Sequence, residues 1–517
     1  MIQIRIIRTA VREITIQTTA VPTAALMTVE GIIQVTREAD DKMVRFQMIR
    51  ISLLLLLASA TLYSQGVNDA LRLSEQGIGY STRALGMGNA YIGLSDDATG
   101  MHINPAGIGL AKRMEFTGGL SYTNMSNAST FFGNTTNYDN SSTKLNNLSF
   151  LLPFPTVRGS LVFGMTYNVE KDFNRGMKFD GYNPGNNSFI QNALGVDDAY
   201  DLFLTDDDGN TKINGRLNQS GSILESGTVS KWGFSGAIEA YPNLFLGATL
   251  NIMNSSYENS REYFEDDLLG IYDTMELAPG YPFTRQFRYF AYSPVYKWDI
   301  GGWNMKAGAL YQIKDFARVG ITIQFPKVFS VNEKFEYSAS SHFGDGTVKN
   351  VGNSGDPSEV EYDIITPFEL SAGASYRFYG LILSGQVTAV DYKQTKFSNP
   401  EGLSEKDIAD INRDIKDQLR AVINYNIGAE YTIPQVGVRV RAGYFVQKSP
   451  YQGDDSSFDK KYITGGIGLL LDDNVSIDLA YARGEWNDIG DNYGSGVSRT
   501  LQKIKTDNLL LGVGFRF

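Results

Sequence analysis

Apolar and polar residues alternate along much of this chain, and the alternation is most regular at its end. The apolar face of the last nine residues consists of Leu509, Leu511, Val513, Phe515 and Phe517. The opposite face carries Leu510, Gly512, Gly514 and Arg516. A period of two residues is the signature of a β-strand. An unbroken apolar face that ends on an aromatic residue fits a strand with hydrocarbon on one side and a polar lumen on the other.

Fourteen alternating segments follow one another from Met114 to the end of the chain. They begin near Met114, Lys144, Arg158, Val229, Leu244, Gly301, Ala317, Tyr362, Gly380, Ala421, Val436, Lys461, Asn474 and Asp507. Short turns rich in Pro, Gly, Asn and Asp alternate with long loops. The long loops cover roughly 126–142, 171–228, 257–299, 330–360, 397–420, 448–460 and 484–506. Short turns on one rim and long loops on the other are typical of an outer-membrane barrel. We therefore predict an all-β fold, in which residues 114–517 form a 14-stranded antiparallel transmembrane β-barrel with long extracellular loops.

Charged side chains recur on one face of the predicted strands. This face carries Glu369, Arg377, Glu430, Arg439, Arg441, Asp478 and Arg516. An arginine that faced lipid at mid-bilayer would cost about 2–4 kcal/mol, so we assign this face to the lumen. The alternative is an ordinary antiparallel sheet with one solvated face.

One loop has the period of a helix instead of a strand. Ile408, Ile411, Ile415 and Leu419 recur at spacings of three and four residues. Such spacing predicts an amphipathic helix from Ser404 to Leu419, packed over the mouth of the barrel.

A short apolar run near the N-terminus indicates export. The basic residues Arg45 and Arg50 precede Leu53–Leu57, and small residues follow up to Gln65. The pattern predicts a secretory signal peptide at 43–64, since the run is shorter than the roughly 20 residues that a membrane-spanning helix needs. We interpret residues 1–42 as a non-native upstream extension. The alternative is a genuine cytoplasmic leader.

The chain has no cysteine and only two histidines, His102 and His342. Disulfides, thiolate metal sites and cysteine nucleophiles are therefore excluded. Neither histidine belongs to a recognisable catalytic or metal-binding pattern. We expect no enzymatic activity, no cofactor and no bound metal. The formal net charge of −11 also disfavours a nucleic-acid partner.

Residues 65–113 are small and polar and do not alternate. Ser95 or Asp96 is a suitable N-cap for a short helix, and Pro105 would end that helix at Asn104. We predict that this segment folds back into the lumen as a hatch or plug, because a barrel of this width leaves space that must be filled or gated. The alternative is an unattached periplasmic leader.

The same segment resembles a known family. Ala84-Leu85-Gly86-Met87-Gly88-Asn89-Ala90-Tyr91, Asp96-Asp97-Ala98 and Asn104-Pro105-Ala106-Gly107 are similar to the N-terminal hatch of FadL/TodX-type transporters of hydrophobic compounds. The likeness continues at Asn168, Asp172-Phe173-Asn174, Thr366-Pro367-Phe368, Asp391-Tyr392 and Gly428-Ala429-Glu430-Tyr431. The resemblance implies a gate at Gly86, Gly88, Asp96, Asp97, Asn104, Pro105, Ala106 and Gly107. It also implies a lateral exit at a kinked third strand, at Asp172, Phe173 and Asn174.

By this resemblance the protein takes up fatty acids or aromatic hydrocarbons passively across the outer membrane of a Gram-negative bacterium. Ligand would enter through the extracellular loops, reach an apolar pocket near the hatch and leave sideways into lipid. We expect a monomer. Phe283, Phe287, Tyr289 and Phe290 are our own candidates for a capture groove and match no family motif.

Two other functions fit the same pattern. One is a PorV-like barrel that binds protein partners in secretion or surface attachment, and the other is a general aqueous porin. The acidic loop residues Asp206-Asp207-Asp208 and Glu265-Asp266-Asp267 are unusual at a fatty-acid entrance. They are either solvated or available to divalent cations or a partner.

Overall fold

The computed structural model describes residues 66–79, 81–471, 474–493 and 498–517. The predicted upstream extension (1–42) and signal peptide (43–64) lie outside these residues. Within the described part, no helix is long and apolar enough to cross a membrane.

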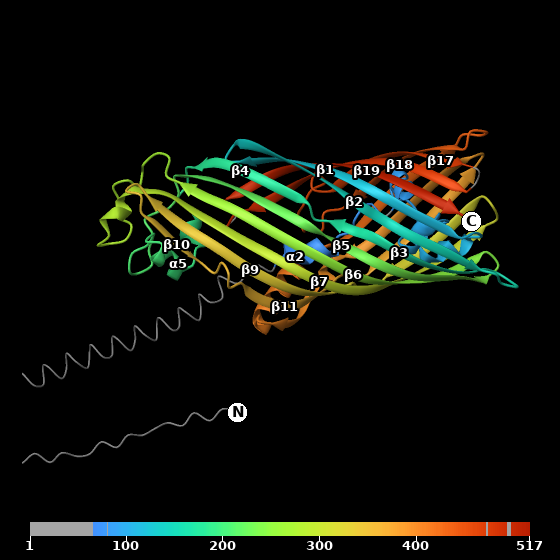
Figure 1. Cartoon of the computed structure of the whole chain (residues 1–517), viewed down its shortest axis with the longest axis horizontal. Coiled ribbons are helices and arrows are strands. Elements are labelled where there is room, and N and C mark those ends of the chain that lie inside the picture. Colours follow the sequence, from blue (N-terminus) through green and yellow to red (C-terminus); the bar gives the residue numbers. More distant parts are fainter. Residues whose placement is uncertain (1–65, 80, 472–473, 494–497) are drawn as a thin grey trace, which may run out of the picture. The chain divides into compact units, whose positions relative to one another are not determined.

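The strands form one closed antiparallel barrel (Figure 1). The ring closes because β1 (Glu115–Phe131) pairs with both β2 (Asn134–Phe154) and β19 (Arg499–Arg516). The other uninterrupted strands are β5 (Leu217–Tyr241), β6 (Leu244–Asp266), β7 (Phe287–Ile313), β15 (Ala421–Thr432), β16 (Val438–Gln447), β17 (Lys460–Leu471) and β18 (Val475–Asp491).

The remaining strand segments combine into four further strands of the barrel wall, each of them interrupted. We call each complete wall strand, interrupted or not, a stave. The four interrupted staves are β3 (Leu161–Asp172) with β4 (Arg175–Asn183), β8 (Ala317–Gln324) with β9 (Val328–Phe343), β10 (Val348–Gly352) with β11 (Ser358–Ile365) and β12 (Glu369–Phe378), and β13 (Leu381–Asp391) with β14 (Lys396–Glu401). Over the described residues the 19 strand segments therefore make 14 staves. The predicted 14-stranded barrel is confirmed.

The outer surface of the barrel carries an apolar belt. On β6 the outward positions Leu246, Leu250 and Ile252 are exposed and apolar, and the next outward positions, Asn254 and Ser256, are exposed and polar. The belt thus matches the 9–11 residues of a strand that crosses hydrocarbon. Because β6 continues to Asp266, the wall extends well beyond the belt on the side of the long loops.

The long loops form a compact structure at that rim, which we name the loop cap. It contains α4 (Phe189–Asn192), α5 (Val196–Asp201) and η3 (Pro282–Gln286). Its core includes Phe131, Phe179, Phe189, Leu202, Leu204, Tyr263, Tyr272, Phe287, Phe290 and Phe343. The predicted amphipathic helix is α6 (Glu405–Gln418), and its residues Ile408, Ile411 and Ile415 are buried.

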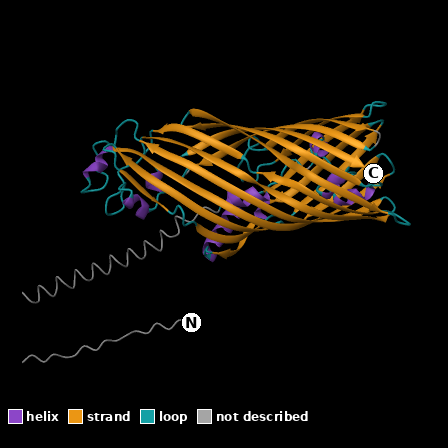
Figure 2. Cartoon of the chain, in the orientation of Figure 1, coloured by secondary structure: helices purple, strands orange, loops and turns teal. Residues whose placement is uncertain are grey.

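Residues 66–111 lie inside the barrel, where strands surround their helices (Figure 2). The elements are α2 (Val67–Ser74), α3 (Thr82–Gly86), η1 (Ala98–Met101) and η2 (Pro105–Leu110). From here the name hatch is kept for residues 81–111, which follow α2. The predicted caps were wrong in detail. Asp97, and not Ser95 or Asp96, caps η1, and Pro105 begins η2 instead of only ending a helix. Proline is favoured at the first helical position because its missing N–H would have no partner there.

Candidate functional site

The hatch glycines lie where the internal segment meets the barrel wall. Gly88 has a positive φ of 60°, and a Cβ at this position would be 2.7 Å from the carbonyl oxygen of Ile427. A side chain on Gly428 or Gly443 of the wall would collide with the backbone of Met87 and Gly88 in turn. Glycine is therefore required on both sides of this contact, because the two backbones touch without intervening side chains.

The hatch carboxylates belong to a cluster of ion pairs that reaches the wall. Arg83 Nη1 lies 2.7 Å from Asp96 Oδ1 and 3.3 Å from Asp97 Oδ2, and its Nη2 lies 2.9 Å from Glu430 Oε1. Arg318 of β8 contacts Asp96 Oδ2 at 2.9 Å. The sequence reasoning missed Arg83, although it is the one basic residue near two carboxylates in an otherwise small and polar segment.

The remaining hatch residues are also anchors. The Asn104 side-chain amide donates to the carbonyls of Ile92 (3.1 Å) and Ala309 (3.2 Å), and its oxygen accepts from the amide of Ala106. Pro105 packs so closely on Gly247 that a Cβ on Gly247 would lie 2.5 Å from it. Gly107 packs against Ser95 in the same way. The predicted hatch residues that contact the wall are Gly86, Gly88, Asp96, Asn104, Pro105 and Ala106. Asp97 and Gly107 contact other residues of the internal segment.

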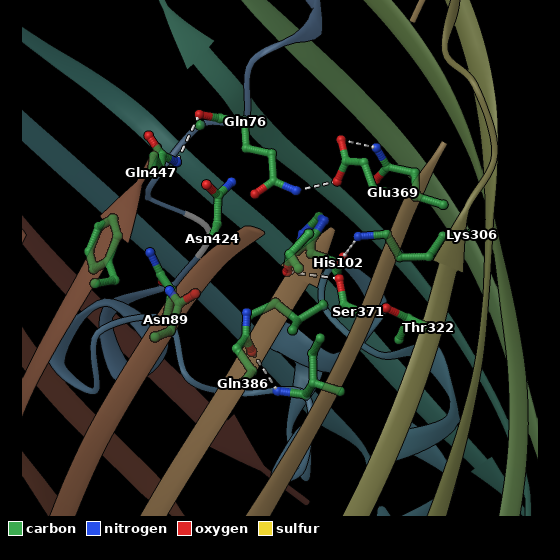
Figure 3. Close-up of a pocket in the computed structure, with 17 residues that line it drawn as sticks. Gln76, Asn89, His102, Lys306, Thr322, Glu369, Ser371, Gln386, Asn424 and Gln447 are labelled. Carbon is green, nitrogen blue, oxygen red and sulfur yellow. Dashed lines mark hydrogen bonds between the residues drawn. The ribbon is translucent and has the colours of Figure 1, made fainter. Parts of the chain in front are cut away.

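A cavity of about 60 Å³ lies above the hatch, and most of the residues that line it are polar (Figure 3). Gln76 donates to Glu369, Gln324 donates to the other oxygen of Glu369 at 2.8 Å, and Lys306 Nζ donates to the carbonyl of His102 at 2.8 Å. The expectation of an apolar pocket at this place was therefore wrong. The looped hatch backbone exposes polar groups toward the wall, and amide and charged side chains satisfy them.

An apolar patch lies higher in the lumen, toward the long loops. It is formed by Tyr257, Trp298, Phe329, Val331, Tyr362, Ile364 and Phe397 on the inner faces of β6, β7, β9, β11 and β14. Helix α2 covers it with Val67, Ala70 and Leu71, and α6 packs into the same cluster. Arg72 of α2 lies over the Tyr257 ring, 4.4 Å from its centroid. Its Nη2 contacts Glu225 Oε1 at 2.8 Å.

The third stave is interrupted beside this patch. β3 ends at Asp172, β4 begins at Arg175, and the ladder between β2 and β3 runs only over Asn147–Phe154 of β2. We call this interruption the β3–β4 break. It lies at the edge of the apolar belt, because the outward-facing Leu145 of β2 is followed toward the long loops by polar Thr143.

Side chains cross the break where the backbone ladder does not. Asp172 Oδ1 accepts from Lys144 Nζ at 2.6 Å, and its Oδ2 accepts from Ser142 Oγ at 2.7 Å. Asn174 folds back to donate to Asp172 at 2.7 Å. Phe173 is 4% exposed and packs edge-on against Tyr257 in the apolar patch. The three residues predicted for the exit therefore form one unit between the wall and the patch.

The segment around α2 contacts both sides of the break. Lys171 Nζ donates to the carbonyl of Arg72 at 2.9 Å and lies 3.4 Å from Glu75 Oε2. Glu225 binds Arg72 and also Arg175, the first residue beyond the break. No local pattern in the sequence predicts these contacts, since their partners are about 100 to 150 residues apart.

The predicted capture residues belong to the loop cap. Phe287 and Phe290 are fully buried, Phe283 packs against Phe343, and Tyr289 stacks on His342 with centroids 4.0 Å apart. The acidic loop residue Glu265 is also buried, and it accepts hydrogen bonds from the amide of Phe189, from Gln219 and from Tyr263. In the described residues, no cluster of three or more acidic or histidine side chains suits a metal ion.

Two solved structures are similar to this chain over most of its length. The toluene transporter TodX of Pseudomonas putida has 13% sequence identity, covers 85% of this chain and 99% of its own, and gives a TM-score of 0.51. A FadL homologue of Pseudomonas aeruginosa has 12% identity, covers 86% of this chain and 98% of its own, and gives a TM-score of 0.52. No protein family model and no curated protein matches the chain in sequence.

The similarity to these structures shows the fold, and the apolar belt indicates that the barrel is surrounded by lipid. A closed barrel whose outward strand positions are apolar is the architecture of bacterial outer-membrane proteins, in which short turns face the periplasm and long loops face the exterior. The chain therefore has the fold of TodX and the FadL homologue, and its apolar belt fits the outer membrane of a Gram-negative bacterium.

Proposed function

We propose that this protein takes up hydrophobic small molecules, such as long-chain fatty acids or aromatic hydrocarbons, passively across the outer membrane. One observation carries the proposal: an apolar patch in the lumen lies directly beside a break in the wall, at the edge of the apolar belt. The similar structure TodX is named as a toluene transporter. A greasy molecule gains about 25 cal/mol per Å² when its apolar surface leaves water, so a lateral exit into lipid is favourable.

In this proposal α2 is the movable part of the gate. Val67, Ala70 and Leu71 occupy the apolar surface that a ligand needs, so ligand and helix compete for the patch. Withdrawal of α2 would also remove Arg72 from Lys171 and Glu225 and thereby loosen both sides of the break. The hatch below remains in place. Ligand leaves above the polar cavity and never crosses it, and a single barrel carries out the whole path as a monomer.

The break can be locked specifically, because the chain has no cysteine of its own. Ser142→Cys with Asp172→Cys places a thiol pair across the break, where the native side chains already touch. We expect the oxidised pair to abolish uptake of labelled oleate or toluene into cells, and a reductant to restore it. The control pair is Ser149→Cys with Thr166→Cys, which are ladder partners on the same two strands below the break.

Formation of each disulfide is verified by loss of maleimide labelling. Unchanged uptake with the break oxidised would contradict the lateral exit. Equal loss in the control pair would show that cross-linking these strands at any level blocks the protein.

A further inference from the structure

A second cavity lies at the periplasmic end of the barrel, on the far side of the hatch from the polar cavity. Its volume is about 310 Å³. Four of the residues that line it are arginines, namely Arg83, Arg377, Arg439 and Arg516. Only two lining residues are acidic, Asp96 and Glu430. The concentration of positive charge is notable in a chain with a formal net charge of −11. We call this cavity the arginine pocket.

The two carboxylates of the pocket are already neutralised. Asp96 is paired with Arg83 and with Arg318. Glu430 is paired with Arg83 and with Arg441, which approaches it at 2.7 Å. No acidic group in the lining therefore remains to balance the other arginines.

The other arginines differ in their partners. Arg516 is bound by Glu115 at 2.9 Å. Arg377 and Arg439 have no ion pair within the described residues. They line the cavity from β12 and β16. Two guanidinium groups thus face one water-accessible space with their donors available.

The spacing of Arg377 and Arg439 limits the kind of solute that could bind both of them. β13 and β15 lie between β12 and β16 in the wall, so the two backbones are separated by three strand spacings, or about 14 Å. Because arginine side chains are long, both guanidinium groups can be directed at one solute in the cavity, and a solute with two negative charges would pair with both of them. The cavity volume is at the lower end of the range for small-molecule sites, about 300–1,000 Å³.

We propose that the arginine pocket binds a small periplasmic solute that carries two or more carboxylate or phosphate groups. The planar guanidinium matches the two oxygens of a carboxylate or phosphate and binds them with paired hydrogen bonds. The barrel wall separates the pocket from the bilayer, which favours a free solute over a lipid headgroup. Because Arg83 and Asp96 belong to the hatch and also line the pocket, bound solute stabilises the hatch in its closed position. The proposal does not depend on the uptake function.

The test is calorimetric titration of the purified full-length protein in an uncharged detergent at low ionic strength. The probes are citrate and pyrophosphate, with acetate as the singly charged comparison. We expect saturable binding of one probe molecule, at least about tenfold tighter than acetate, a difference of about 1.4 kcal/mol. Binding should weaken as salt is added, because the contacts are between charges.

The variant Arg377→Gln/Arg439→Gln should lose about tenfold or more in affinity. The matched control Arg158→Gln/Lys314→Gln removes two positive charges from exposed turns at the same rim and should bind as the unaltered protein does. Each single substitution, R377Q and R439Q, should give an intermediate loss, so the result does not rest on one doubly altered barrel.

Three results of the titrations would overturn the proposal, and a fourth comes from competition with a lipid. The three are no saturable binding of either probe to the unaltered protein, acetate binding as tightly as citrate, and equal loss of affinity in the arginine pair and in the control pair. In the last experiment, brominated phosphatidylglycerol in mixed micelles is added as a competitor of citrate. Displacement of citrate by this lipid at comparable concentration would identify the pocket as a headgroup site and refute the assignment to a free solute.

Discussion

Two parts of the internal segment are held in the lumen by different means. The hatch, residues 81–111, contacts the wall backbone-to-backbone at paired glycines and through a cluster of ion pairs around Arg83. Helix α2 has eight residues, one apolar face and the anchors of Arg72. The hatch contacts depend on close fit, which is lost by very small shifts. The α2 contacts are largely apolar burial, which another apolar molecule can replace. The difference indicates that the hatch closes the lumen permanently at the lower level, whereas α2 is a closure above it that a ligand can displace.

The largest expected effect comes from disturbing the fit of the hatch. Gly88→Ala adds a Cβ 2.7 Å from Ile427 O at a φ of 60°, and we expect a loss of about 2–4 kcal/mol from strain and overpacking. The measurement is the urea midpoint of the folded barrel, read from its migration in unheated gels. The control is Gly133→Ala, which has a φ of 84° but open space around the added Cβ. If the urea midpoint falls by the same amount in both variants, backbone strain alone is responsible for the loss of stability and the close fit is not.

The next effect comes from releasing α2. Arg72→Gln removes the ion pairs to Glu225 and to Asp69 of the same helix, together with the contact with Tyr257. Arg175 still neutralises Glu225. Loss of one partner of a buried pair costs about 3–5 kcal/mol, and Arg175 reduces that cost. We expect amide hydrogen exchange to accelerate by at least about tenfold at residues 67–74, with no change at residues 84–108. Equal acceleration in both regions would mean that they move as one unit and would remove the distinction between them.

A smaller effect is expected at the β3–β4 break. Asp172→Asn removes the charge that binds Lys144 while an oxygen remains for Ser142. The pair is partly exposed, so the loss of stability should be at most about 1 kcal/mol, whereas uptake of labelled ligand should increase. Lys334→Gln is the control, because it breaks the exposed pair with Glu359 away from the break. Decreased uptake in D172N with an unchanged control would show that the side-chain bridge organises the exit instead of closing it.

The last effect is a pH dependence, and it distinguishes the loop cap from both lumen regions. Burial raises the pKa of Glu265 to about 7, from an ordinary value of 4.5. Between these values the folded cap holds a proton that the unfolded chain releases, so cap stability falls as pH rises from about 4.5 through 7. The protection factors of the amides at residues 189–204, in which exchange rates are corrected for their intrinsic pH dependence, should therefore be larger at pH 5.5 than at pH 8. Glu265→Gln should remove the difference, and a pH dependence that persists in this variant would assign it to another group.

Much of the fold was determined by local patterns. The period of two fixed the fourteen staves, the spacing of Ile408, Ile411 and Ile415 predicted α6, and the small residues around Gly86 and Gly88 marked the segment that touches the wall. Each of these features reflects the preference of a short stretch for one face or one backbone conformation. The residues that carry the information are neighbours in the sequence, so no long-range knowledge was needed.

The site required the tertiary structure. Nothing near Phe287 or Phe290 shows that they are buried in the loop cap, and nothing near Arg72 indicates Glu225 as its partner. The polar lining above the hatch, the apolar patch under α2 and the arginine pocket each unite several staves with the N-terminal segment. Alternation decides which side of the wall a residue faces. Only closure of the barrel decides which luminal side chains meet. These contacts depend on the register of the strands and on the path of the N-terminal segment inside the barrel.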